Sequence, residues 1–110
     1  MAFTPYHNIT GSTGINVELI APGSNIGEIR SIMITNTHAT ADATVSLFIQ
    51  NDPVAATASS FYILSTVAIP ADTSLLLDNS SVLSFNNSSS GYGLYLTVGS
   101  SDTLDVLINT

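Results

Sequence analysis

The histidine and carboxylate side chains are the residues of this chain with the clearest potential for catalysis or metal binding. The 110 residues include two histidines, His7 and His38, eight acidic residues and no cysteine. Nucleophilic catalysis needs a serine, cysteine or similar group held beside a base, and no nucleophile-elbow motif is present. His7 lies near the N-terminus and His38 in a polar loop, so the sequence predicts no catalytic residues and no enzyme.

Turn formation accounts for the placement of half of the carboxylates. Aspartate is favoured in turns because its side chain hydrogen-bonds nearby backbone groups, and four aspartates fall in predicted turns: Asp42, Asp52, Asp72 and Asp102. A glycosidase would need two carboxylates facing one groove, whereas turn roles explain these four aspartates. Calcium takes several oxygen ligands, but neither Asp102 with Asp105 nor Asp72 with Asp78 has calcium-loop spacing. Zinc would lack thiolate ligands, so no metal and no cofactor are expected.

The charge balance restricts the class of partner. Arg30 is the only basic residue, and the net charge is −7. Nucleic acids and anionic membranes are bound largely through lysine and arginine, so neither partner is expected. No apolar run reaches the roughly 20 residues of a membrane-spanning helix, and no secretory signal is expected at the N-terminus.

The polar surface must consist mainly of serine, threonine and asparagine, because charged residues make up only 8% of the chain. Ordinary domains contain about 25% charged residues. A neutral polar surface costs less to desolvate than a charged one when it is buried against a partner. The composition therefore suits an assembly subunit, although adaptation to a salty medium or compositional drift would produce it too.

Apolar residues alternate with polar ones along most of the chain, which is the period of a β-strand. The clearest runs place Ala43, Val45, Leu47 and Ile49 on one face, and likewise Tyr92, Leu94, Leu96 and Val98, then Leu104, Val106 and Ile108. A further series begins with Ile15, Val17 and Leu19. Seven or eight strands are predicted, over about 15–20, 27–36, 43–50, 60–69, 73–78, 81–85, 92–98 and 103–109.

Turn residues separate these runs. Pro22 and Gly23 predict a tight turn, residues 36–42 a polar hairpin loop, and residues 99–102 the turn of a last hairpin. Turn signals recur every 8–15 residues. This spacing predicts an all-β fold of the sandwich or barrel type.

The stretch GEIRSIMITN contains a change of phase. Ile32 and Ile34 are two residues apart, as one buried face requires, whereas Ile29 is out of phase with them. A β-bulge near Arg30–Ser31 would restore the phase by adding one residue. Arg30 would then lie close to Glu28, and a local Arg–Glu pair is expected, with an intersubunit salt bridge as the alternative.

The N-terminal residues lack clean alternation. They define an N-terminal arm, residues 1–14, followed by a single domain, residues 15–110. The arm carries Phe3 and Tyr6, two aromatic side chains that would cover either the chain's own sheet or a neighbouring subunit. Phe3, Tyr6 and Arg30 are the expected interface residues.

Several segments together resemble small virion proteins of tailed bacteriophages, of the cyanophage type. These segments are LIAPGSNIGEIRSIMITNTHATADATVSLFI, then VAIPADTSLLLD, then SGYGLYLTVGSSDTLDVLI, and they span about residues 15–109. The shared pattern is a Pro-Gly turn, an Ile-Arg-Ser-Ile strand, an Ile-Pro-Ala entry to a leucine-rich strand and a final Leu-x-Val strand. The resemblance implies an antiparallel β-sandwich of jelly-roll-like topology that forms homo-oligomers, and it carries no catalytic residues.

The resemblance also implies a role. The chain is expected to be a virion structural protein, assembled in the host cytoplasm, and most specifically a capsid decoration (cement) protein. Its partners would be further copies of itself, with a trimer favoured, and the major capsid protein or other virion proteins. Tail, neck or fibre subunits are the alternatives within this class, and a carbohydrate- or receptor-binding β-sandwich module is the alternative from another class.

Overall fold

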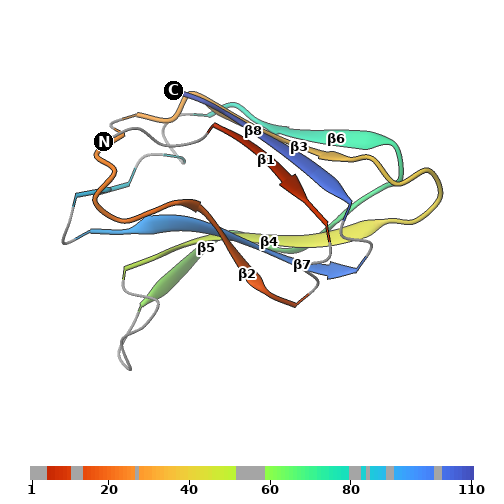
Figure 1. The fold of residues 1–110 in the computed structure, drawn as a ribbon, viewed down its shortest axis with the longest axis horizontal. Helices are drawn as coiled ribbons and strands as arrows, with labels where there is room; N and C mark the ends of the chain where they lie inside the picture. The colour runs from red at the N-terminus through yellow and green to blue at the C-terminus, as the bar shows by residue number, and fades with distance from the viewer. Residues whose placement is uncertain are drawn as a thin grey trace.

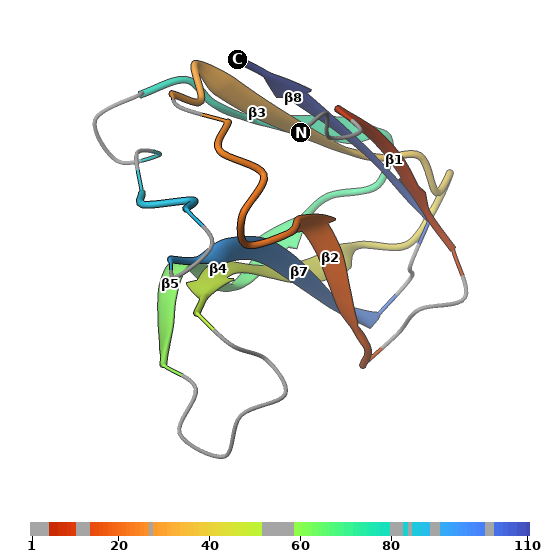
Figure 2. The ribbon, with the colours of Figure 1, turned by 60° about the vertical axis from the view of Figure 1, so that its left-hand side comes forward.

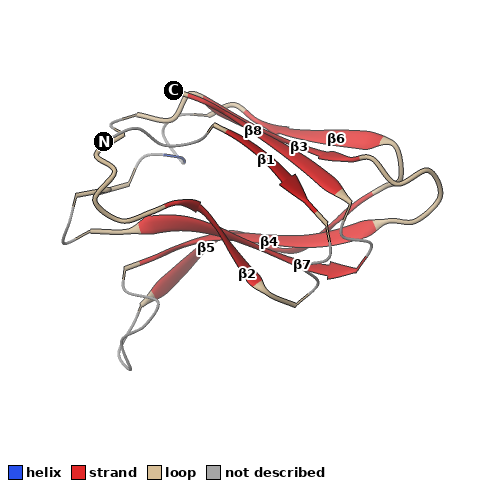
Figure 3. Ribbon diagram, in the orientation of Figure 1, coloured by secondary structure: helices blue, strands red, loops and turns tan. Residues whose placement is uncertain are grey.

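The protein folds as two antiparallel β-sheets stacked face to face, each of four strands. A computed structural model describes residues 5–10, 14–26, 28–51, 59–79, 83, 85–88, 91–100 and 103–110. The strands, which dominate Figure 3, are β1 (Tyr6–Ile9), β2 (Asn16–Ile20), β3 (Ser31–Asn36), β4 (Ala43–Gln50), β5 (Ser60–Ile69), β6 (Thr73–Leu77), β7 (Gly93–Ser100) and β8 (Leu104–Asn109). The predicted all-β sandwich is confirmed.

The strand order is that of a jelly roll. One sheet has the order β1-β8-β3-β6 and the other β2-β7-β4-β5 (Figures 1 and 2). The first half of the chain therefore pairs with the second half in reverse, as β1 with β8, β2 with β7, β3 with β6 and β4 with β5. Two further pairings, β3 with β8 and β4 with β7, complete the two sheets. A long antiparallel ribbon rolled in this way is the jelly-roll architecture.

Most connections cross from one sheet to the other. Only β4 and β5 are both consecutive in sequence and paired with each other. The predicted hairpins at 36–42 and 99–102 are therefore wrong, because β3 and β4 lie in different sheets, as do β7 and β8. Loop composition marks the end of a strand, but it carries no information about which strand lies beside it.

An apolar layer fills the space between the sheets. Its buried members come from every strand except β6, whose Leu75 and Leu77 pack against the layer while partly exposed. The predicted inward positions Val45, Leu96 and Val106 are fully buried. Within the described residues, no helix has the length and apolar character needed to cross a bilayer.

The predicted change of phase lies at the entry to β3. Ile29 and Ile32 are both buried although they are three residues apart, so one extra residue separates them. The regular strand begins only at Ser31, where the Arg30 amide donates to the Asn109 carbonyl at 2.7 Å. The irregularity thus precedes β3 rather than interrupting a strand that begins at residue 27.

A shift in β2 alters the expected pattern in the same way. The pairing of β2 with β7 shifts between Glu18 and Ile20. Leu19 and Ile20 are consequently both buried, whereas Ile15 is exposed. The inward series predicted to begin at Ile15 is therefore wrong at its first residue.

The expected N-terminal arm belongs in part to the sandwich. Residues 6–9 form β1, which pairs with β8 and buries Ile9 in the core. This segment joins the chain's own sheet as a strand, whereas its Tyr6 side chain is exposed and Phe3 lies outside the described residues. The strand predicted at 81–85 lies mostly outside the described residues, although Leu83 is buried.

Truncation of a leucine should distinguish the two sides of the sandwich. We expect Leu96→Ala to lower the free energy of unfolding by about 2–5 kcal/mol, because it opens a cavity in the core. The same change at Leu107, on the outer face, should cost less than about 1 kcal/mol. Urea unfolding followed by circular dichroism measures both values, and equal losses would contradict the assigned facing of β7 and β8.

Candidate protein-binding surface

The outer face of the β1-β8-β3-β6 sheet carries a continuous row of apolar side chains. Tyr6 of β1 lies opposite Leu107 of β8, Leu107 opposite Met33 of β3, and Met33 opposite Leu76 of β6. Side chains directly opposite one another in antiparallel strands point to the same face and lie within contact range. The row, here called the apolar row, therefore crosses all four strands.

Water reaches most of the apolar row. The side chains of Tyr6, Leu76 and Leu107 are 69%, 56% and 40% exposed, and Met33 is half-buried. The strand neighbours of Met33, Leu76 and Leu107 belong to the apolar layer or pack against it, so the alternation that buries the core leaves this row outside. Scattered exposed apolar residues are ordinary, whereas a contiguous set rimmed by polar groups is typical of a binding surface.

Small polar side chains lie along one side of the apolar row. The neighbouring register positions hold Asn8, Asp105, Thr35 and Ser74. The Asn8 amide donates to the Asp105 carboxylate at 2.6 Å, and the hydroxyls of Thr35 and Ser74 are 2.8 Å apart. This polar rim is hydrogen-bonded within itself, and Asp105 is its single charged residue.

The three residues expected at an interface differ in where the structure places them. Tyr6 is part of the apolar row, and Phe3 lies outside the described residues. Arg30 is exposed at the entry to β3, at the margin of the same sheet. The expected ion pair between Arg30 and Glu28 does not form, although both residues are described, so that prediction is wrong.

Sequence reasoning missed the other three members of the row. Leu76, Leu107 and Met33 occupy outward positions in strands whose inward positions are also apolar. The sequence signal for the row was an apolar residue at each of these outward positions. Whether such residues form one row depends on the register that aligns β1, β8, β3 and β6, which local sequence does not specify.

The opposite sheet carries a second row on its outer face. Glu18, Tyr95, Phe48 and Tyr62 lie opposite one another across β2, β7, β4 and β5. The Phe48 ring lies 5.0 Å from that of Tyr62 and 5.9 Å from that of Tyr95, whose hydroxyl donates to Glu18 at 3.2 Å. Phe48 and Tyr95 are buried, so Tyr62 alone of these three rings is open to a ligand.

The two histidines lie in different elements, His7 on β1 and His38 in the loop after β3. The Nδ1 atom of His38 accepts hydrogen bonds from the amides of Thr40 and Ala41. Its loop is held further by Asn36, whose buried amide donates to the Ala41 carbonyl and accepts from the His38 amide. His7 lies on β1, and its Nε2 atom is buried without a hydrogen-bond partner among the described residues.

The carboxylates of the described residues do not gather in a metal-binding cluster. Within the described part of the chain, no three histidine, aspartate or glutamate side chains gather as a metal site would require. Asp72 lies in the turn before β6 with a φ of 57°, and its amide donates to the His38 carbonyl. This placement is the turn role that the sequence predicts for Asp72, whereas Asp52 and Asp102 lie outside the described residues.

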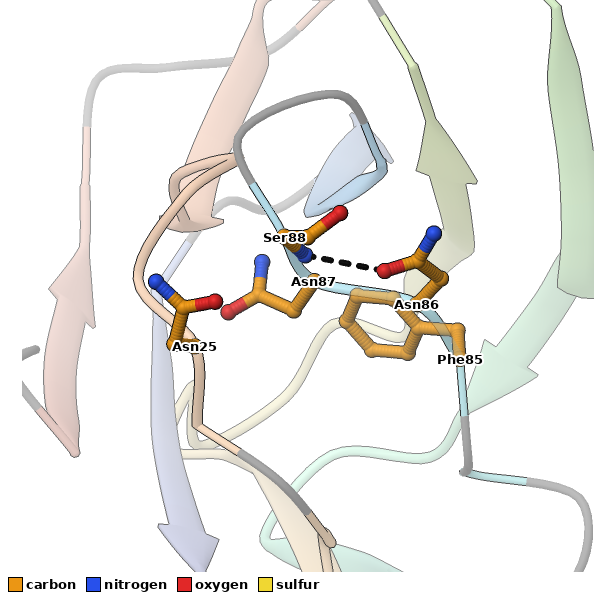
Figure 4. A pocket seen from close by; sticks show the side chains of 5 residues that line it. All are labelled: Asn25, Phe85, Asn86, Asn87 and Ser88. Atoms are coloured by element: carbon orange, nitrogen blue, oxygen red, sulfur yellow. Dashed lines mark hydrogen bonds between the residues drawn. The ribbon is translucent and has the colours of Figure 1, made fainter.

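A hollow of about 330 Å³ lies at one end of the sandwich, lined by Asn25, Phe85, Asn86, Asn87 and Ser88 (Figure 4). Asn87 is buried, and its amide donates to the carbonyls of Ala21 and Tyr92 and accepts from the Ile26 amide. The backbone carbonyl of Asn87 accepts hydrogen bonds from the backbone amides of Gly23 and Asn25.

The polar groups of Asn87 are therefore occupied in joining the 21–26 loop to the segment before β7. The hollow lies beside this junction and is lined by its residues. Its buried asparagine serves the fold and leaves no group directed at a ligand.

No protein-family model, no curated protein and no solved structure matches this chain.

Loss of the Asn87 side chain should loosen this end of the sandwich. We expect Asn87→Ala to lower the free energy of unfolding by about 2–4 kcal/mol, because partly buried backbone groups of Ala21, Ile26 and Tyr92 lose their partner. Asn86→Ala is the matched control, since the exposed Asn86 side chain accepts from the nearby Ser88 amide. Equal stability of the two variants in urea unfolding would show that the junction contributes little.

Proposed function

We propose that this chain is a non-enzymatic structural protein of a bacteriophage virion, and specifically a decoration protein that stabilises the head through protein–protein contacts. The observation that carries this proposal is the apolar row, a contiguous and accessible strip across a sheet whose other outward side chains are mainly small and neutral. Such a surface is typical of a site that binds another protein.

The fold and the composition support the same class. Jelly rolls recur in viral capsid proteins, although they also occur in lectin domains, so the fold alone does not specify the role. The resemblance of residues 15–109 to small phage virion proteins favours the capsid class. A surface with few charges is inexpensive to desolvate at an interface.

The energetics favour many contacts acting together. Burial of a half-exposed leucine or tyrosine contributes about 1 kcal/mol, so the apolar row supplies a few kcal/mol in all. Association costs at least about 4 kcal/mol in lost rigid-body freedom. A single subunit would therefore bind weakly, whereas linked copies on a lattice gain affinity through their effective concentration. A repeated surface such as a phage head provides that setting.

The same surface would serve a subunit of the tail, neck or fibre. In each case the chain assembles in the host cytoplasm and remains in the particle, with other virion proteins and further copies of itself as partners. The identity of the protein that contacts the apolar row distinguishes these positions.

A carbohydrate-binding module is the second candidate, and Tyr62 is the observation that favours it. Its ring is 59% exposed on the outer face of the β2-β7-β4-β5 sheet, next to Gln50 and Ser60, whose side chains are hydrogen-bonded at 2.8 Å. Sugars stack on such rings and bond to neighbouring amides. Binding on a glycan array that Tyr62→Ala abolishes would favour this function over the structural one.

Charge placed on the apolar row tests the leading proposal. Purified protein would be co-sedimented with isolated heads of the phage that encodes the chain. We expect Leu107→Asp and Leu76→Asp each to weaken binding at least tenfold, because a carboxylate would be buried against the partner. Ile15→Asp is the matched control, since Ile15 is 58% exposed, lies away from the row, and receives the same charge.

Two results would contradict the proposal. One is the absence of the chain from the purified particles by mass spectrometry. The other is undiminished binding of both row variants while circular dichroism shows that they are folded. Cross-links from the row to a tail protein instead of a head protein would assign the tail position.

A further inference from the structure

The four edge strands of the two sheets differ in how they are protected. The edge strands β1, β2 and β6 have four or five residues each, whereas β5 has ten. Short edge strands and charged edge residues prevent unwanted pairing. β5 contains no charged residue and lies at the outer margin of its sheet (Figure 2).

Irregular pairing protects only the second part of β5. The register with β4 shifts after Tyr62 and again near Thr66, a β-branched residue with the unfavourable φ of 53°. Such shifts bend an edge and obstruct further pairing. Before them, Ser60, Phe61 and Tyr62 pair regularly with Gln50, Ile49 and Phe48.

The backbone in this regular part directs alternate hydrogen-bonding groups away from β4. The Asn51 amide donates to the Ser59 carbonyl at 3.2 Å. Because hydrogen-bonded and non-hydrogen-bonded positions alternate between antiparallel strands, Ser59 and Phe61 direct their backbone groups toward β4. Ser60 and Tyr62 therefore direct theirs toward the open edge.

Aromatic side chains are exposed on both faces at the same place. Phe61 and Tyr62 are neighbours in the strand, so they point to opposite faces. Phe61 is 57% exposed although its ring lies 5.9 Å from that of Tyr92, and Tyr62 is similarly exposed although its ring contacts Phe48. Described residues thus leave both faces of this edge partly uncovered.

We propose that the Ser60–Tyr62 edge of β5 pairs with the same edge of a second copy of the chain, antiparallel and about a two-fold axis at Phe61. Ser60 of one copy then lies opposite Tyr62 of the other, and their outward backbone groups bond across the junction. The two Phe61 side chains meet on one face as a cross-strand aromatic pair.

A second copy suits this edge better than an unrelated peptide. The segment is self-complementary under a two-fold operation, which closes the assembly at two copies rather than continuing into a fibre. The strand contributes no carboxylate to the junction, so the net charge of −7 on each copy is not concentrated where the copies meet. This contact is independent of the apolar row and of the proposed virion function.

Cross-linking at Phe61 tests the pairing directly. The chain contains no cysteine, so a single introduced thiol reports one contact. The non-hydrogen-bonded position at the axis brings the two Cα atoms within the range that a disulfide spans. We expect Phe61→Cys to form covalent dimers under mild oxidation at least ten times faster than Ile15→Cys, a control of matching exposure at 58%.

A backbone change provides the second measurement. Ser60→Pro removes an outward amide without removing a bond to β4, whereas Ser60→Ala retains the amide and loses only the hydroxyl. By light scattering after size exclusion, Ser60→Pro should have half the mass of Ser60→Ala, with both variants shown to be folded by circular dichroism.

Three results would overturn the proposal. They are equal masses of the two Ser60 variants, equal cross-linking of the two cysteine variants, and capture of an unrelated peptide by a monomeric wild-type chain.

Discussion

The apolar layer between the two sheets is the constraint on which the rest of this structure depends. The chain has no cysteine and a single basic residue, so neither disulfides nor a network of ion pairs can stabilise it. Burial of one side of each strand must supply most of the stability. Because side chains alternate along a strand, fixing the inward side also fixes the outward side, and the two outer faces are set by the same packing.

The jelly-roll pairing converts those outward positions into surfaces. Tyr6 and Leu107 come from opposite ends of the chain, yet β1 and β8 bring them side by side. Met33 and Leu76 extend the apolar row through β3 and β6. On the other sheet, the same geometry brings Phe48 between Tyr62 and Tyr95. The function that we propose depends on such cross-strand rows rather than on the hollow near Asn87, whose polar groups are engaged in hydrogen bonds within the chain.

Local pattern predicted the bounds of several strands closely. The bounds expected for 43–50 and 60–69 agree with β4 and β5, and 103–109 differs from β8 by one residue. The strand bounds and side-chain facing were predicted less well near Ile29 and Ile15, where the inward and outward positions exchange. In sequence, such a shift in register appears only as a break in the apolar–polar alternation. The Arg30–Glu28 pair failed for a related reason: closeness in sequence does not bring two exposed side chains together.

The sequence by itself determined the all-β class, most of the core positions and the small share of charged side chains. These properties follow from composition and from the two-residue period, which are local. Only the tertiary structure decided that β1 joins the sheet, that most connections cross between sheets, and that Tyr6, Leu107, Met33 and Leu76 form one row. Strand order and register are set by packing between segments distant in the chain, and the same local alternation is compatible with many pairings.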